Sequence, residues 1–298
     1  MNRANIVLTG LPRSGTTLAC RLLNTLPDTV ALHEPIAPRK FADAEDESAV
    51  LEGVERFFRR MRRMIRREKV ALSKNVGGKI PDNAYEQSRS ETGLRSHSGG
   101  KGTEKGKMAV DKELKRNFLL IVKQPALFSA LLPVLGERFP CYAIVRNPLS
   151  VLASWNSVDH MVREGHSRGA ELYDEGLRRE LSSMQDRVVR QLLLLSWWYE
   201  RFYTTLDKNH IVRYEDIVSF GGRALSAITP VAKTLREPLS SQNLNALYNR
   251  EEMRELGNRL LCSEGAYWRF YTRESVEKLI EEIAARPKPD ELQRSAKP

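Results

Sequence analysis

Residues 5–17 read NIVLTGLPRSGTT. The first five residues are centred on an apolar run typical of a buried strand, and a loop with Gly10 and Gly15 follows. Apolar residues at helical spacing then predict a helix over residues 18–26, and a second apolar run at 30–32 predicts another strand. Two strands that flank one helix form a βαβ unit, which predicts a parallel sheet.

The rest of the chain predicts the same fold class. Apolar runs at residues 119–122 and 141–145 predict two further buried strands, and residues 126–135 between them predict a helix. A long helix over 176–206 precedes a short strand at 210–213. We therefore expect an α/β fold in which helices flank a central, mainly parallel sheet.

One large domain is expected, because 298 residues bury one sizeable core and leave little chain for a second. Residues 86–107 are rich in Ser, Gly, Lys and Arg with few apolar side chains, which predicts a mobile loop. Residues 286–298 predict a frayed polar tail. The expected organisation is a domain over residues 1–285 followed by this tail.

Composition narrows the class of protein. Hydrophobic residues make up 41% of the chain and charged residues 29%, as in soluble globular proteins, and no apolar run reaches the roughly 18 residues of a membrane span. We expect no secretion signal, because the first strand begins too early. Cys20, Cys141 and Cys262 lack disulfide or zinc spacing, which favours the cytoplasm. A net charge of +10 favours anionic ligands or partners.

Residues 10–17 have the spacing of a P-loop between a strand and a helix, GxxxxG followed by two residues. Backbone N–H groups of such a loop bind phosphate groups. The lysine that kinases use is replaced by Thr16, and the nearest cation is Arg13. No apolar run ending in Asp offers an obvious magnesium ligand. The sequence therefore predicts a P-loop-like phosphate-binding loop that does not serve magnesium-dependent phosphoryl transfer.

Residues 12–17, PRSGTT, resemble the loop with which sulfotransferases hold the 5′ end of their donor, 3′-phosphoadenosine-5′-phosphosulfate. The resemblance implies a transferase that uses this nucleotide as co-substrate and needs no metal. It is closer to bacterial, tyrosylprotein and carbohydrate sulfotransferases than to the cytosolic small-molecule enzymes. The residues that it assigns to the 5′-phosphosulfate are Arg13, Ser14, Gly15, Thr16 and Thr17.

A second motif, residues 144–154, places Arg146 at the end of a strand and Ser154 two turns into the next helix. A guanidinium and a hydroxyl can both bind one phosphate. The segment resembles the sulfotransferase motif for the donor's 3′-phosphate, which implies that role for both residues; a plain helix-capping turn is the alternative. Residues 212–217 resemble a family segment of mainly structural role. Residues 265–271 resemble an aromatic stretch near the nucleotide or acceptor, with core packing as the alternative.

Transfer to a hydroxyl needs a general base, and the resemblance places it at Glu34. Tyrosylprotein and some bacterial sulfotransferases use a glutamate shortly after the first helix, whereas the histidine of cytosolic enzymes is absent after Lys123. Lys123 and Arg13 then correspond to catalytic cations near the sulfuryl group. The alternatives are a surface carboxylate and a solvated strand-end lysine. In an extended segment His33 would point away from Glu34, so only one of the two should face the site.

Arginines crowd the helix predicted over residues 49–70, which also has an apolar stripe. This pattern is compatible with an anionic membrane surface or an acidic glycan as partner, and a solvated face is the alternative. Specific nucleic-acid binding is not expected, because no aromatic platform or recognition motif accompanies the charge. The basic segment 56–69 contains Arg56, Arg59, Arg60, Arg62, Arg63, Arg66, Arg67 and Lys69.

The sequence thus predicts a cytoplasmic or membrane-peripheral sulfotransferase that acts on a hydroxyl, or less readily an amine, of an unidentified acceptor. Three alternatives remain open. A P-loop small-molecule kinase would need the lysine that Thr16 replaces. A noncatalytic nucleotide- or glycan-binding module would share every donor motif, and a basic nucleic-acid binder would make the loops incidental.

Overall fold

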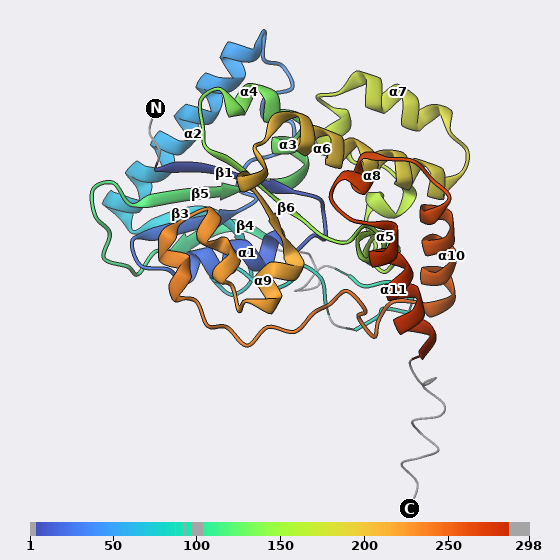
Figure 1. Cartoon of the computed structure of the whole chain (residues 1–298). Helices are drawn as coiled ribbons and strands as arrows, with labels where there is room; N and C mark the ends of the chain where they lie inside the picture. The colour runs from blue at the N-terminus through green and yellow to red at the C-terminus, as the bar shows by residue number, and fades with distance from the viewer. Residues whose placement is uncertain (1–3, 87, 92, 97–103, 286–298) are drawn as a thin grey trace, which may run out of the picture.

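Five parallel strands form the central sheet of the protein, in the order β2-β5-β1-β6-β7 (Figure 1). These strands are β1 (Asn5–Gly10), β2 (Thr29–His33), β5 (Leu119–Lys123), β6 (Cys141–Val145) and β7 (Ile211–Arg213). The computed structural model describes residues 4–86, 88–91, 93–96 and 104–285. The predicted α/β class is confirmed, and each of the strands predicted from the sequence belongs to this sheet.

The strand order decides where the sheet can bind a ligand. From β1 the chain leaves toward β2, and from β6 it leaves toward β7 on the opposite side. The crevice between the carboxyl ends of β1 and β6 is therefore the switch point of the sheet, where α/β proteins bind their ligands. Parallel register pairs Gly10 with Ile144 across this crevice and His33 with Lys123 at the ends of β2 and β5. Both sequence motifs and the expected catalytic residues thus reach one edge.

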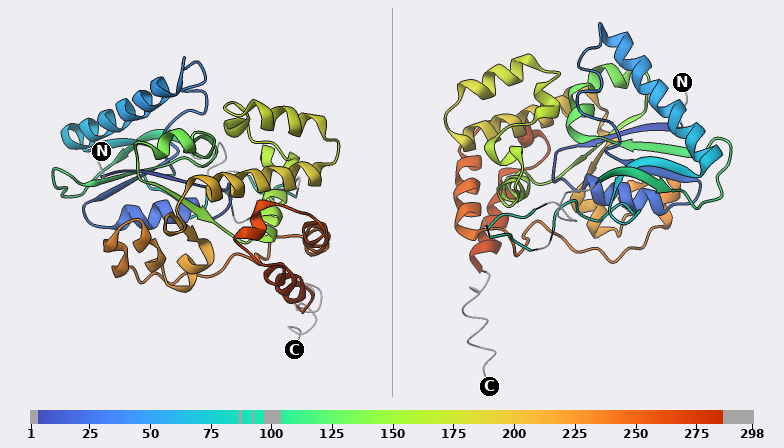
Figure 2. Two further views of the ribbon diagram at one scale, coloured as in Figure 1. Left: turned by 45° about the horizontal axis from the view of Figure 1, so that its top comes forward. Right: turned by 180° about the vertical axis from the view of Figure 1, so that it is seen from behind.

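Helices cover both faces of the sheet (Figure 1, Figure 2). In Figure 1, α1 (Thr16–Thr25) and α9 (Tyr214–Ser219) lie below the sheet, and α3 (Pro125–Ala130), α4 (Leu132–Gly136) and α8 (Arg187–Thr205) lie above it. Helix α2 (Glu47–Glu68) packs on α4, and α5 (Pro148–Asn156) packs against α10 (Arg250–Leu261) and α11 (Arg273–Ala285). The remaining helices are α6 (Arg168–Glu171), α7 (Glu175–Ser183) and 3-10 turns at Met161–Glu164, Lys208–His210, Arg223–Ala227, Pro230–Thr234 and Ala266–Arg269.

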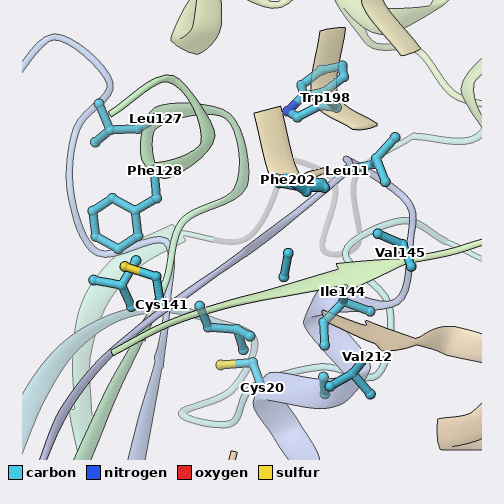
Figure 3. Close-up of a cluster of buried hydrophobic side chains, with 14 of the residues drawn as sticks. Leu11, Cys20, Leu127, Phe128, Cys141, Ile144, Val145, Trp198, Phe202 and Val212 are labelled. Carbon is cyan, nitrogen blue, oxygen red and sulfur yellow. The ribbon is translucent and has the colours of Figure 1, made fainter. Parts of the chain in front are cut away.

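Buried side chains from both faces hold these layers together (Figure 3). Cys20 of α1 packs on one side of the sheet, whereas Phe128 of α3 and Phe202 of α8 pack on the other, and none of the three is accessible to solvent. Every residue of β1 and β2 is buried. Coverage on both faces explains why these strands are continuous apolar runs rather than alternating ones.

A two-stranded antiparallel sheet, β3 (Val70–Asn75) with β4 (Glu104–Ala109), stands beside β2. The N–H of His33 donates to Oγ of Ser73 (3.0 Å), which ties β3 to the end of β2. Neither strand is among those predicted from the sequence. Helix α2 ends earlier than expected, because Lys69 adopts a left-handed conformation (φ 54°). Strand β4 pairs with β3, which is distant in the chain, so its conformation is not set by local sequence.

Two helices predicted as continuous are each divided in two. The helix expected over 176–206 breaks before Asp186, whose carboxylate accepts the N–H groups of Val188 and Val189 and so starts α8. The helix expected over 126–135 breaks at Leu131, because Pro133 in the first turn of α4 has no N–H to continue the helical hydrogen bonds.

Several expectations concern residues outside those described. Residues 87, 92 and 97–103 of the loop expected over 86–107 are among them, and so is the tail 286–298, so that the mobility of these residues and the domain boundary stay predictions. Within the described part of the expected loop, residues 104–107 belong to β4, and Arg95 is buried. In the described ranges, no helix combines the length and the apolar character that crossing a bilayer requires. The same ranges contain no group of three or more His, Cys, Asp and Glu side chains that could hold a metal ion.

Arg62 of α2 belongs to the core rather than to the basic surface. It is buried, and its guanidinium donates to Oδ1 of Asn5 (2.7 Å) and to the carbonyl oxygens of Phe118 (3.0 Å) and Ala4 (2.8 Å). Burial, followed by the charge of Arg66, lowers the pKa of Arg62 to about 10, which leaves it charged at neutral pH. Arg62 therefore fastens α2 to the starts of β1 and β5. The exposed cations of segment 56–69 are Arg56, Arg59, Arg60, Arg63, Arg66, Arg67 and Lys69.

We expect Arg62→Ala to lower the free energy of unfolding by about 2–4 kcal/mol, because three acceptors would lose a charged donor at once. Urea denaturation followed by circular dichroism measures this change. The exposed neighbour provides a matched control, and Arg63→Ala should change the same free energy by less than about 0.5 kcal/mol. Equal losses in the two variants would contradict the structural role of Arg62.

Candidate functional site

Two glycines allow the loop after β1 to pack directly on its neighbours. Gly10 has φ 148° and Gly15 has φ 91°, conformations that side chains disfavour. A Cβ on Gly10 would lie 2.4 Å from the carbonyl oxygen of Ile144, and one on Gly15 would lie 2.5 Å from Cδ2 of Tyr214. The loop therefore needs glycine at both positions, because β6 and α9 approach it so closely.

Ser14 fastens the loop to the sheet. Its hydroxyl is buried, 2.8 Å from the carbonyl oxygens of both Leu11 and Ile144, so its single proton is shared with the backbone. Helix α1 begins at Thr16, and its first N–H groups have no carbonyl partner within the helix. Together with the helix dipole, these groups suit an anion placed at the loop.

A cavity of about 500 Å³ opens beside this loop, and we call it the arginine cavity. Its arginines are Arg13, Arg21, Arg95 and Arg146. The carboxylates in its wall, Asp82 and Glu237, both pair with Arg21. The predicted donor-binding residues in its wall are Arg13, Gly15, Thr16, Thr17 and Arg146. The excess positive charge suits a ligand that carries several negative charges.

Arg146 is buried at the end of β6 and held in a fixed orientation. The acceptors of its N–H groups are Oδ1 of Asn243 (2.8 Å), the carbonyl oxygens of Arg13 (2.9 Å) and Gln242, and the hydroxyl of Tyr248 (3.4 Å). The segment before α10 therefore closes around the guanidinium. Arg146 still contributes to the wall of the arginine cavity.

Ser154 contacts Arg13 and does not line the arginine cavity. Nε of Arg13 donates to Oγ of the fully buried Ser154 (3.1 Å), and Nη1 donates to Oδ1 of Asn83 (2.9 Å). The same guanidinium lies 4.6 Å from the centroid of the Tyr85 ring. Burial lowers the pKa of Arg13 to about 10, so that it remains charged at neutral pH. The structure thus separates the two residues of the second motif: Arg146 lines the cavity, and Ser154 supports Arg13.

A second cavity of about 300 Å³ lies at the carboxyl ends of β2 and β5, and we call it the lysine cavity. Its ionisable residues include Lys74, Lys123, Glu34, His33 and Arg168. Three residues of the loop and of α1 line both cavities: Arg13, Thr16 and Thr17. The two cavities therefore meet at the loop.

Lys123 is a buried ammonium whose three N–H groups all have acceptors. Its side chain is 2% exposed, and Nζ lies 2.6 Å from Oε1 of Glu34, 3.3 Å from Oγ1 of Thr17 and 3.2 Å from Nδ1 of His33. Since an ammonium only donates, His33 accepts through Nδ1 and carries its proton on Nε2. Burial, reinforced by Lys123, lowers the pKa of His33 to about 3, so the ring is neutral.

Glu34 bridges two lysines. Its Oε1 accepts from Lys123, and its Oε2 accepts from Nζ of Lys74 (2.7 Å). Burial alone would raise the pKa of Glu34, but its cationic neighbours, Lys123 foremost, hold that pKa well below its ordinary value of 4.5. Glu34 is therefore an ion-paired carboxylate at neutral pH. The burial of Lys123 argues against the alternative of a solvated strand-end lysine.

The expectation that only one of His33 and Glu34 faces the site is wrong. Strand β2 ends at His33, and Glu34 adopts a left-handed conformation with φ 45°, so the segment is not extended there. The N–H of Glu34 donates to the carbonyl oxygen of Lys123 (2.8 Å), which fixes the turn. Both side chains then reach the ammonium of Lys123, and the site gains a neutral histidine.

Several residues of the two cavities are not among those predicted from the sequence. Lys74 lies on β3, and the short apolar run of residues 70–72 at the start of this strand is the signal by which it could have been predicted. Arg95 and Tyr248 line the arginine cavity from irregular segments far apart in the chain. No local pattern identifies them, because only long-range contacts bring them to the loop.

Residues 212–217 and residues 265–271, the two other segments that resemble sulfotransferases, differ in whether they line a cavity. Tyr214 lines the arginine cavity, packs on Gly15, and lies under Arg146, with 4.7 Å from the guanidinium carbon to the ring centroid. Segment 212–217 therefore contributes to the site as well as to the fold. None of residues 265–271 lines the arginine or the lysine cavity, and Tyr267 is fully buried among aromatic rings, which fits core packing.

Comparisons with known proteins give similar structures but no matching sequence. No protein-family model and no curated protein matches the chain. The similar solved structures include three sulfotransferases or sulfotransferase domains. The sulfotransferase domain from the curacin biosynthetic pathway is 16% identical, covering 82% of this chain and 77% of that one, with a TM-score of 0.37. The sulfotransferase domain of the Synechococcus PCC 7002 olefin synthase is 15% identical, covering 95% of each chain, with a TM-score of 0.36. Sulfotransferase STF1 from Mycobacterium tuberculosis H37Rv is 14% identical, covering 86% and 76%, with a TM-score of 0.34.

The ion pair of Glu34 and Lys123 predicts a pH-dependent loss of stability in Glu34→Gln. At pH 7 the variant should unfold more easily than the wild type, because Lys123 keeps its burial and loses its counter-ion. The pKa of Glu34 is lower in the folded than in the unfolded chain, so its contribution is complete above the unfolded value and fades as the pH falls through the folded one. The difference between the two proteins should therefore shrink below about pH 4.

Urea denaturation at several pH values between 7 and 3 measures this difference. The exposed residue Glu113 provides a control, since Glu113→Gln should have little effect at any pH. A difference between Glu34→Gln and the wild type that stays constant down to pH 3 would contradict the ion pair.

Proposed function

We propose that the protein is a sulfotransferase that uses 3′-phosphoadenosine-5′-phosphosulfate as donor and a hydroxyl or amine as acceptor. The observation that carries this proposal is the junction of the two cavities at Arg13, Thr16 and Thr17. A nucleotide in the arginine cavity with its 5′ end at the junction would present its sulfuryl group to a molecule in the lysine cavity. Cations and a carboxylate lie beside that junction, as transfer to a nucleophile requires.

The arginine cavity supports the donor half of the proposal. The N-terminus of α1 with Thr16 and Thr17 would bind the 5′-phosphosulfate, and Arg146 would bind near the 3′-phosphate. Ser14 would act by holding the loop, and Ser154 by holding Arg13 through its hydrogen bond to Nε. An anionic nucleotide would offset the unpaired positive charge of the cavity.

In the proposed reaction the acceptor oxygen attacks the sulfur atom while the bond from sulfur to the 5′-phosphate oxygen breaks. The leaving group is 3′-phosphoadenosine-5′-phosphate, and the acceptor proton passes to a carboxylate oxygen of Glu34. Negative charge grows on the bridging oxygen of the leaving phosphate, where Arg13 and Lys123 would stabilise it. The acceptor gains the sulfuryl group, and no electron is exchanged with a further reactant.

Donor binding would also make Glu34 a better base. In the free protein the lysines around it hold the pKa of Glu34 well below 4.5, although burial opposes them, and so weak a base removes protons poorly. An anionic donor that draws Lys123 toward the junction would weaken the ion pair and bring negative charge closer to Glu34. Both changes raise the pKa of a carboxylate. The base would therefore gain strength when the donor is in place.

The alternative functions account for fewer of the residues in the two cavities. A magnesium-dependent kinase would need a loop lysine where Thr16 stands. A noncatalytic nucleotide-binding module would use the arginine cavity but would give the Lys123–Glu34 pair of the lysine cavity no role. The acceptor, a cytoplasmic location, and an anionic membrane surface or acidic glycan at the exposed cations of segment 56–69 stay predictions.

Donor recognition predicts a preference for the 3′-phosphorylated nucleotide. In calorimetric titrations without added magnesium, 3′-phosphoadenosine-5′-phosphate should bind more tightly than 5′-AMP or ATP. Arg146→Ala should weaken its binding about 10- to 100-fold, because a charge-assisted hydrogen bond is lost. 5′-AMP should lose less affinity in this variant, because Arg146 reaches the 5′ end only through the carbonyl oxygen of Arg13. Circular dichroism checks the fold. Equal binding of all three nucleotides by the wild type would remove the basis for the proposed function.

Glu34→Gln should keep its affinity for 3′-phosphoadenosine-5′-phosphate and lose transfer by about 10²- to 10⁴-fold, the usual contribution of a general base. The measurement is release of this nucleotide from the sulfated donor in the presence of a panel of hydroxyl and amine acceptors. His33→Gln, which alters the neutral neighbour at the same ammonium, provides a comparison and should have the smaller effect. Near-normal turnover of Glu34→Gln would exclude Glu34 as the base.

A further inference from the structure

Arg95 is a buried arginine in the wall of the arginine cavity that neither sequence motif contains. It is 1% exposed although it belongs to a polar segment, residues 93–96, with few apolar neighbours in sequence. Burying a guanidinium costs free energy unless it is paired or satisfied by hydrogen bonds. The contacts of Arg95 therefore show how far the protein itself offsets this cost.

The backbone of Arg95 is fixed to the end of the helix that carries Ser154. Its N–H donates to the carbonyl oxygen of Ser157 (2.9 Å), and its own carbonyl oxygen accepts from the N–H of Asp159 (3.1 Å). Its Nε donates to the carbonyl oxygen of Glu86 (2.7 Å). These hydrogen bonds hold the side chain in a fixed position in the cavity wall.

The guanidinium of Arg95 is nevertheless not fully satisfied. Its Nη2 is buried and has no hydrogen-bond partner among the described residues. No carboxylate offsets its charge in the cavity, because Asp82 and Glu237 both pair with Arg21. Burial lowers the pKa of Arg95, and the neighbouring Tyr248 and Tyr85 oppose this shift only in part.

The proposed nucleotide site has few free hydrogen-bond donors for the 3′-phosphate. An arginine has five N–H groups, and four of those of Arg146 are bound to protein acceptors. Ser154, the second residue of that motif, accepts from Arg13 and does not line the cavity. A dianionic phosphate needs more than one remaining N–H, whereas the 5′ end has the N-terminus of α1. Arg95, which has a nitrogen unpaired among the described residues, therefore lines the same cavity in which the 3′-phosphate would need further hydrogen-bond donors.

We propose that Arg95 is a ligand of the nucleotide's 3′-phosphate and acts with Arg146 to distinguish the 3′-phosphorylated donor from ordinary adenosine nucleotides. This inference rests on the proposed function, because it takes the nucleotide site as given. Arg95 would donate to phosphate oxygens through its terminal nitrogens while Nε keeps its bond to Glu86. Segment 93–96 thereby becomes part of the donor site.

Calorimetric titration of the full chain with 3′-phosphoadenosine-5′-phosphate and with 5′-AMP tests the proposal. Arg95→Ala should bind the first nucleotide about 10- to 100-fold more weakly, since a charge-assisted hydrogen bond is lost, and should bind 5′-AMP as the wild type does. Arg95→Gln should behave in the same way and serves as the test if the alanine variant does not fold. The exposed Arg179 provides the matched control, because Arg179→Ala removes the same charge away from both cavities and should leave both affinities unchanged.

Each outcome separates the inference from the function on which it rests. Unchanged binding of 3′-phosphoadenosine-5′-phosphate by a folded Arg95 variant, with a wild type that prefers this nucleotide to 5′-AMP, overturns the role of Arg95 alone. Equal weakening of both nucleotides also overturns it, because the arginine would then act on the 5′ end. A wild type without preference for the 3′-phosphorylated nucleotide overturns the proposed function and this inference together.

Discussion

The parallel pairing of β1 with β5 on one side and β6 on the other is the constraint on which the site depends. Parallel strands end at the same edge, so the phosphate loop, Lys123 and Arg146 meet there although long stretches of chain separate them. Pairing of β2 with β5 adds His33 directly opposite Lys123. A change of strand order would therefore separate the two cavities even if each motif kept its own conformation.

The buried cations of the protein differ in whether all their N–H groups have hydrogen-bond acceptors. Arg62 meets three oxygen acceptors, and Lys123 uses all its N–H groups within the site, so both are satisfied by the protein itself. The arginine cavity differs, because Arg95 keeps a buried nitrogen without a partner among the described residues. Since burying charge is costly, a buried guanidinium nitrogen without a partner in the wall of a cavity is consistent with a place for an anion.

Local sequence patterns predicted the elements better than their ends. The apolar runs of the central strands are unambiguous, because strands covered on both faces have few polar residues. The break before α8 depends on the side chain of Asp186, which can cap a helix or remain within one, and the periodicity is the same on either side. Strand β4 has almost no apolar signal, because its partner β3 and not its composition determines its conformation.

The sequence by itself determined the loop of residues 10–17 and the strand and helix around it, because glycine spacing and apolar periodicity act over a few residues. It also indicated Glu34, Lys123 and Arg146 as residues at strand ends. The tertiary structure alone decided that Glu34 pairs with two lysines, that Ser154 supports Arg13, and that Arg95 enters the cavity. Those contacts join residues far apart in the chain, and a left-handed turn at Glu34 or a buried guanidinium leaves no pattern in the neighbouring residues.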